Sequence, residues 1–192
     1  MKCKRFGKGR HDALAEAADN LARSAGLQSR REPVGILQDG TSKRPGDVLL
    51  PTFDRGAIVA LDFRVTNNKQ AILLGQALRV GRASRFGYQQ KMTRWHARCA
   101  AVNVKFIPMS VDTYGYWHEE SRAVLFEIAK RRSHFTERDP DLEFKYSLQL
   151  LSTILQRENA RILIEHKQRP QVFAEEESEA VILIEDELVP SG

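Results

Sequence analysis

The residues of this sequence best suited to chemistry are two carboxylates placed in short apolar runs. Asp47 precedes the run 48–50, and Asp62 lies inside the run 58–66. An acid is costly to place in a run that would otherwise form a buried strand, so two such acids suggest a shared site. Carboxylate oxygens hold Mg²⁺ (or Mn²⁺), and the bound ion can activate water and stabilise charge on a phosphate. The pattern indicates metal-dependent phosphodiester hydrolysis, with Asp47 and Asp62 as ligands.

Two cationic residues compete for the role of orienting the attacking water or neutralising the transition state. Arg64 shares a strand face with Asp62, because side chains two residues apart in a strand point to the same side. Lys91 lies on a helix predicted downstream, and lysine changes its protonation state more readily than arginine. A purely structural reading is the alternative, in which Asp62 forms an ordinary ion pair with Arg64 and Asp47 caps a turn.

Charge is distributed unevenly along the chain. Residues 1–110 hold 20 Lys and Arg against 8 Asp and Glu, whereas residues 111–192 hold 10 against 17. A basic first part favours a nucleic-acid surface, and DNA is the expected partner. The residues expected to contact phosphates are Arg44, Arg94 and Arg98, the last two in a basic stripe with Lys91 that would otherwise be a solvated helix face.

The periodicities predict a mixed α/β domain without the steady alternation of a doubly wound sheet. Strands are predicted at 27–38, 47–50, 58–66 and 104–111. Helices are predicted at 11–25, 70–80, 88–102, 119–132 and from 140 to about 166, with a break near 81–87. Residues 1–10 are interpreted as a basic flexible arm, 11–166 as the domain, and 167–192 as an acidic, poorly ordered tail.

The other reactive side chains favour structural roles. His11 lies on the apolar side of its helix and is interpreted as a packing residue, and Cys99 as a core thiol. Two cysteines do not make a disulfide framework, which favours a reducing compartment. No apolar run approaches the roughly 20 residues that cross a bilayer, and no secretory signal follows the basic N-terminus. We therefore expect an intracellular protein, nuclear or cytoplasmic, that is not secreted.

Six segments within 10–164 together resemble a known family. They are RHDALAEAADNLARSAGL, RREPVGIL, RPGDVLLP, VALDFRVTN, VKFIPMSVDTYGYW and LQRENARILI. They are similar to the region downstream of the reverse transcriptase in non-LTR retrotransposon polyproteins, a restriction-endonuclease-like domain of the PD-(D/E)XK superfamily. The resemblance implies that fold, with a mixed four-stranded sheet flanked by helices and extra C-terminal helices. It also implies a DNA endonuclease related to target-site nicking.

Carried over residue by residue, the resemblance implies that Asp47 and Asp62 bind the metal. It implies that Lys91 is the catalytic lysine, displaced from the strand onto the helix, since Arg64 stands where that lysine is usually found. Gly46 separates the preceding proline from the first acid, whereas the two are adjacent in the superfamily's name motif.

The resemblance also bears on partners and alternatives. Element RNA or a reverse transcriptase would be a further partner. Cys3 and His11 look like the remnant of the zinc knuckle that precedes such domains, and two ligands do not close a tetrahedral site. Two other functions remain open: a catalytically inactive nucleic-acid-binding module of the same fold, and a protein-interaction domain working through the acidic tail.

Overall fold

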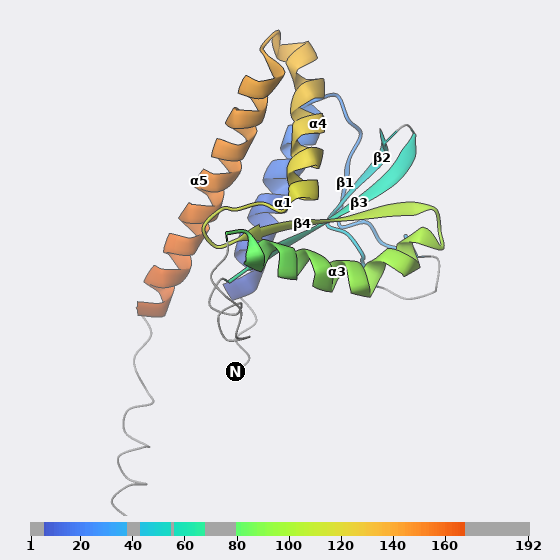
Figure 1. The fold of residues 1–192 in the computed structure, drawn as a ribbon. Coiled ribbons are helices and arrows are strands. Elements are labelled where there is room, and N and C mark those ends of the chain that lie inside the picture. The colour runs from blue at the N-terminus through green and yellow to red at the C-terminus, as the bar shows by residue number, and fades with distance from the viewer. Residues whose placement is uncertain (1–5, 38–42, 55, 68–79, 168–192) are drawn as a thin grey trace, which may run out of the picture. The chain divides into compact units, whose positions relative to one another are not determined.

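The computed structural model describes residues 6–37, 43–54, 56–67 and 80–167. Contacts divide the chain into two units, Met1–Asn159 and Ala160–Gly192, and the sheet and the candidate site lie in the first. The elements are α1 (Phe6–Ser24), β1 (Arg30–Arg31), β2 (Val48–Asp54), β3 (Ala57–Thr66), α3 (Arg82–Ala100), β4 (Val104–Asp112), α4 (Glu119–Thr136) and α5 (Pro140–Lys167). The predicted α/β class is confirmed (Figure 1).

The sheet places the acid-bearing strand in its interior. The strand order is β1-β2-β3-β4, with β1, β2 and β3 antiparallel and β4 parallel to β3. Parallel neighbours cannot be joined by a tight turn, and α3 lies in the crossover between β3 and β4. The sheet is therefore mixed and four-stranded, with helices against it. Among the described residues, no helix is both long and apolar enough to cross a membrane.

Alternate residues of β3 face different cores, as the period of two predicts. Figure 1 shows α3 on the opposite side of the sheet from α1 and α4. Ala60 packs in a small core with Trp95 and Cys99 of α3. Cys99 is the core thiol that was predicted, and burial raises its pKa to about 11. The larger core, with side chains of α1, α4 and α5, takes Val59, Leu61 and Phe63.

Two boundaries at the start of the chain differ from the sequence-based prediction. α1 begins at Phe6 and so includes residues 6–10, which were expected to belong to a flexible arm. The strand predicted at 27–38 is reduced to the two residues of β1. The physical reason is local, because Glu32 has a φ of 44° and the following Pro33 has no N–H to donate to a neighbouring strand.

Within the segment 81–87, where a break was predicted, only Gly81 lies outside a helix. This glycine precedes α3 with a φ of 76°, a conformation that favours glycine. α3 then continues from Arg82 through Gly87, six residues earlier than the predicted start at Tyr88. The long helix predicted after Pro140 is present as α5. Residues 70–79 of another predicted helix, and 168–192 of the predicted tail, lie outside the described residues.

Gly87 sets the distance between α3 and the sheet. A Cβ at this position would lie 2.2 Å from Thr66 Oγ1 and 2.7 Å from Ser110 Oγ, and both residues are buried. Gly87→Ala is expected to lower the free energy of unfolding by about 1–3 kcal/mol in urea titrations, because α3 must move away. At an open helical position the same change would instead stabilise by about 1 kcal/mol.

The exposed Ala97 of the same helix offers a matched control. Ala97→Gly measures the helix-propensity effect alone and is expected to cost about 1 kcal/mol. A Gly87→Ala variant more stable than the wild type would contradict the close packing of α3 on β3 and β4.

Candidate functional site

Asp47 and Asp62 lie opposite each other on neighbouring strands. The antiparallel register that pairs Val48 with Leu61 places Asp47, just before β2, opposite Asp62 in β3. Asp47 Oδ2 accepts a hydrogen bond from the Phe63 N–H at 2.6 Å. The Asp47 N–H donates to the Leu61 carbonyl at 2.8 Å. The backbone of β3 therefore fixes the position of Asp47 beside the second acid.

Gly46 has a packing reason in this arrangement. A Cβ at Gly46 would lie 3.1 Å from Ala60 Cβ and 3.2 Å from the Leu61 carbonyl oxygen. A side chain at this position would therefore require its neighbours in β3, or the chain before β2, to shift by a few tenths of an ångström. Gly46 therefore allows the close approach of the chain before β2 to β3 that brings Asp47 to Asp62.

Lys91 reaches the same place from α3. Its Nζ lies 2.6 Å from Asp62 Oδ2, and the two side chains are 22% and 7% exposed. Lys91 follows Gly87 by four residues, so the two lie on one face of α3, and the close contact at Gly87 holds Lys91 against the sheet. The sequence prediction requires two adjacent acids with Lys91 directed at them, and the structure has this geometry.

The ionised form of Asp62 is destabilised at this position. Burial raises the pKa of Asp62 to about 6, Lys91 opposes that rise, and the negative charge of Asp47 adds to it. A buried carboxylate with a raised pKa is incompletely compensated by its protein neighbours. Such a group would gain from a bound cation.

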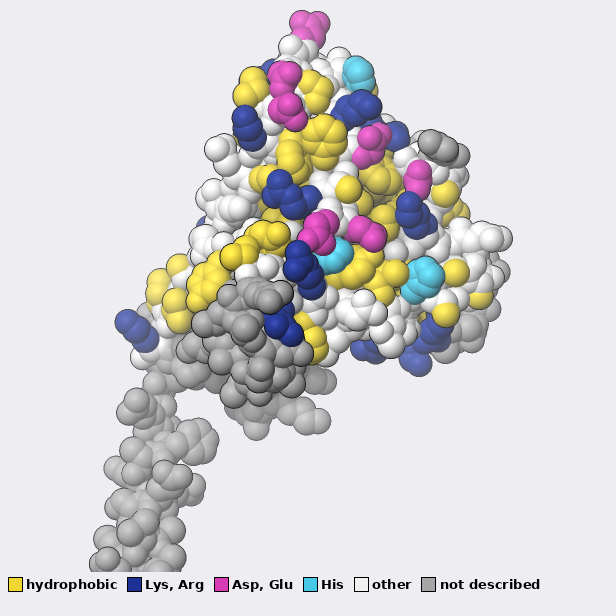
Figure 2. All heavy atoms as spheres, in the orientation of Figure 1, with side chains coloured by type: hydrophobic (Ala, Val, Ile, Leu, Met, Phe, Trp, Pro, Cys, Tyr) yellow, Lys and Arg dark blue, Asp and Glu magenta, His cyan; other side chains and the backbone are white. Residues whose placement is uncertain are grey.

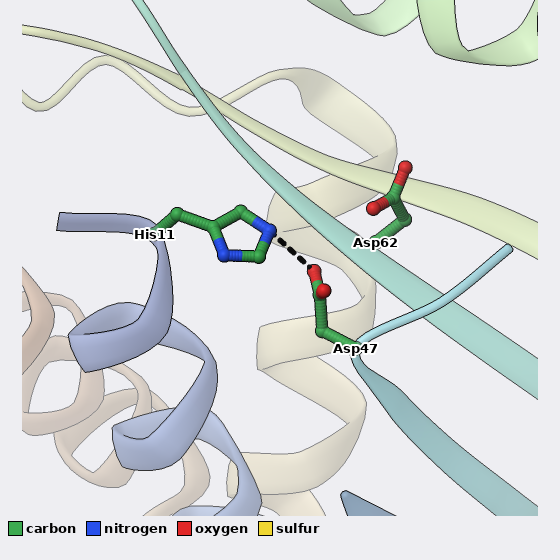
Figure 3. A group of neighbouring side chains, drawn as sticks. All are labelled: His11, Asp47 and Asp62. Carbon is green, nitrogen blue, oxygen red and sulfur yellow. Dashed lines mark ion pairs between the residues drawn. The ribbon is translucent and has the colours of Figure 1, made fainter. Parts of the chain in front are cut away.

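His11 is a site residue that the sequence interpretation missed. Its Nε2 lies 2.8 Å from Asp47 Oδ2, and its Nδ1 lies 3.1 Å from Asp12 Oδ1. Figure 3 shows the ring directed from α1 at Asp47, with Asp62 on the adjoining strand. Burial lowers the pKa of His11, but the hydrogen bond and charge of Asp47, with Asp12, outweigh it and leave the pKa raised.

The interpretation of His11 as a packing residue is therefore wrong. The helical period correctly turns it towards the domain, but nothing local says that the start of α1 meets the chain before β2. Among the described residues, one ligand atom from each of His11, Asp47 and Asp62 lies within 4.8 Å of the others. These three side chains form a group that could hold a metal ion. Cys3, the other residue of the supposed knuckle, lies outside the described residues.

A basic cleft opens beside the acids. Its volume is ≈ 530 Å³, and it is lined by Arg64, Phe86, Gln89, Gln90, Lys91, Thr93 and Arg94. Burial lowers the pKa of the half-buried Arg64, while the charge of Asp62 opposes this effect. The ion pair of Asp62 is with Lys91, so the strand pair with Arg64 that was considered from the sequence is not the arrangement found. Arg64 instead lines the cleft.

The other predicted phosphate-contacting residues fall in different places. Arg94 lines the cleft, and its guanidinium lies 4.9 Å from the centroid of the Trp95 ring. The guanidinium of Arg98 lies 5.3 Å from the same centroid. Arg44 lies outside the cleft lining and forms an exposed ion pair with Glu32. On the face drawn in Figure 2, basic, acidic and apolar side chains are interspersed. The cleft brings the cationic side chains of Arg64, Lys91 and Arg94 together at one place, which the charge asymmetry of the sequence does not locate.

Comparisons of this chain with protein family models, with curated proteins and with solved structures find no match. The geometry of the site and the chemistry of its residues are therefore the basis for a functional proposal.

Proposed function

We propose that this chain is a metal-dependent DNA endonuclease with a restriction-endonuclease-like fold, related to the enzymes that nick the target sites of retrotransposons. One observation carries the proposal. Asp47 comes from the residue before β2, Asp62 from β3 and Lys91 from α3, and they meet beside a basic cleft. The element order, a helix, three antiparallel strands, a helix and a parallel strand, also agrees with the fold that the sequence resemblance implies.

The residues fit a divalent cation. Asp47 and Asp62 offer hard oxygen ligands, and the raised pKa of Asp62 indicates a carboxylate that lacks sufficient positive charge around it. Asp47 and Asp62 would hold Mg²⁺ or Mn²⁺, with the carbonyl of Phe63 as a further oxygen donor. A bound ion supplies polarisation of the phosphate and a lower pKa for a coordinated water.

The cationic side chains have distinct roles in this proposal. Lys91, held against Asp62, positions the attacking water and offsets negative charge as the phosphate becomes more anionic. Arg64 and Arg94 bind phosphate oxygens along the cleft, because a guanidinium can donate two parallel hydrogen bonds to one phosphate. The half-buried setting of Arg64 reduces competition from bulk water for those bonds.

A plasmid assay tests the proposal. Purified protein is expected to convert supercoiled plasmid to the open-circular form in Mg²⁺ or Mn²⁺, and a chelator is expected to stop the reaction. Asp47→Asn is expected to lower the nicking rate by at least about 100-fold, since it replaces an anionic metal ligand with a neutral amide, whose oxygen can still accept the Phe63 N–H. DNA binding, measured by fluorescence anisotropy, should be retained.

Asp54→Asn is the matched control for this assay. Asp54 ends the same strand but forms an exposed ion pair with Lys105, so its replacement should leave nicking unchanged. A wild-type protein that binds DNA with a steep salt dependence yet nicks in neither metal would overturn the nuclease and support the inactive binding module. If the protein neither binds nor cuts DNA, the interaction domain would be the better explanation.

A further inference from the structure

His11 provides a nitrogen donor that the proposed pair of acids does not need. It comes from α1, an element that contributes no other group to the candidate metal centre, and its ring is only 28% exposed. Its Nε2 faces Asp47 Oδ2 at 2.8 Å, and the three potential ligand atoms lie within 4.8 Å of one another. Ligands on one ion with bonds of about 2.1 Å lie roughly 3–4 Å apart, so only a small contraction is required.

We infer that His11 is the third protein ligand of this site and that the site takes Mn²⁺ in preference to Mg²⁺. The inference rests on the proposed function, because it deepens the description of the same metal centre. Two carboxylates alone suit Mg²⁺, Ca²⁺ and Mn²⁺, whereas an imidazole nitrogen favours first-row transition ions over Mg²⁺. The donor set of one nitrogen and two carboxylates therefore selects between two ions that the acids alone would accept.

Asp12 supports this role for His11. Asp12 Oδ1 lies 3.1 Å from His11 Nδ1, the ring nitrogen that points away from Asp47. A carboxylate that accepts the Nδ1–H of a ligating histidine fixes the ring orientation and leaves Nε2 to bind the metal. Asp12 is thus a positioning residue, and the helix that carries both residues presents them as one unit.

The rival explanation is that His11 only forms an ion pair with Asp47. The two explanations predict opposite changes in Mn²⁺ affinity when His11 is removed. If His11 is only an ion-pair partner, its removal frees Asp47 of a competing cation, and the affinity for both metals should rise. If His11 is a ligand, its removal should weaken Mn²⁺ binding while the Mg²⁺ affinity stays unchanged or rises.

Titration calorimetry on the full chain, with Mn²⁺ alone and Mg²⁺ alone and without DNA, measures this difference. The wild type is expected to bind Mn²⁺ at least about 10-fold more tightly than Mg²⁺. His11→Ala is expected to lose on the order of 10–100-fold in Mn²⁺ affinity, and Asp12→Asn about 10-fold. His96→Ala, at an exposed position of α3, is the matched control and should change neither affinity.

Pulsed electron paramagnetic resonance of bound Mn²⁺ gives a second measurement. A ¹⁴N coupling is expected in the wild type and in His96→Ala, and it should be absent from His11→Ala. Equal Mn²⁺ affinity in His11→Ala and the wild type, or a ¹⁴N coupling that survives the substitution, would overturn the inference.

These outcomes separate the inference from the proposed function. If plasmid nicking requires Asp47 but His11→Ala binds Mn²⁺ as the wild type does, the proposed nuclease activity is retained and the assignment of His11 as the third ligand is rejected. If the wild type shows the ¹⁴N coupling and the Mn²⁺ preference but never nicks DNA, the metal site is retained and the proposed nuclease activity is rejected. Asp12→Asn keeps the imidazole and so tests the inference even if His11→Ala is poorly folded.

Discussion

Asp62→Asn is expected to abolish plasmid nicking and, at the same time, to stabilise the metal-free protein. The activity should fall by about 10³-fold or more, because the variant loses a ligand of the proposed metal. The gain in stability follows from the raised pKa of Asp62, about 6 against an ordinary 3.8. At pH 7.5 the wild type keeps this carboxylate ionised at a cost of about 3 kcal/mol.

The expected net gain is smaller than that cost. An asparagine has no charge to desolvate and does not repel Asp47, but it leaves Lys91 without its anionic partner. We expect the free energy of unfolding at pH 7.5, measured by urea titration with a chelator present, to rise by about 1–2 kcal/mol. Asp54→Asn, which removes an exposed acid from β2, should change it by less than about 1 kcal/mol.

The pH dependence gives the sign of this effect an independent check. Between about pH 4 and pH 6 the native state holds a proton on Asp62 that the unfolded chain has already lost. The contribution of Asp62 to stability therefore falls as the pH rises through this window and stays unfavourable above it. The stability difference between Asp62→Asn and the wild type should be small near pH 4 and reach its full size above about pH 7.

Two results would contradict this account of Asp62. One is a variant less stable than the wild type at pH 7.5. The other is a stability difference that does not vary with pH, which would mean that the carboxylate is well compensated without a metal.

Lys91→Gln is expected to lower the nicking rate by about 10²–10⁴-fold while DNA affinity changes little. The amide nitrogen cannot replace the ammonium that lies 2.6 Å from Asp62, so the attacking water would lose the group proposed to position it. Lys91→Arg is not expected to restore the rate, because the larger planar guanidinium does not occupy the same space as an ammonium. The rates should be measured under single-turnover conditions at saturating DNA.

Arg64→Gln is the informative comparison for Lys91, since the sequence offered both cations for one role. Arg64 lines the cleft and is proposed to hold a phosphate, so its loss should weaken DNA binding more than it slows nicking at saturation. Lys105→Gln, which affects an exposed ion pair with Asp54, controls for loss of positive charge in general. If Arg64→Gln abolished nicking at saturating DNA and Lys91→Gln did not, the roles assigned to the two residues would have to be exchanged.

The sequence by itself determined much of the frame around the site. Alternation in β3 placed Val59, Leu61 and Phe63 in one core and turned Asp62 to the other side, because side-chain direction in a strand depends only on local backbone geometry. Apolar spacing located α1, α3, α4 and α5, although the predicted starts of α1 and α3 came five and six residues too late and α4 extends four residues beyond its predicted end. The two acids were found because a carboxylate in an apolar run is costly wherever the run folds.

Only the tertiary structure decided which groups meet those acids. The pairing of Asp62 with Lys91 rather than Arg64 depends on how closely α3 approaches the sheet, which the contact at Gly87 sets. The position of His11 depends on where the start of α1 meets the chain before β2, 36 residues further on. Such contacts arise from the packing of elements distant in sequence, and no local periodicity encodes them. Asp47 and Asp62 could thus be read from the chain, whereas Lys91 and His11 were joined to them by the fold.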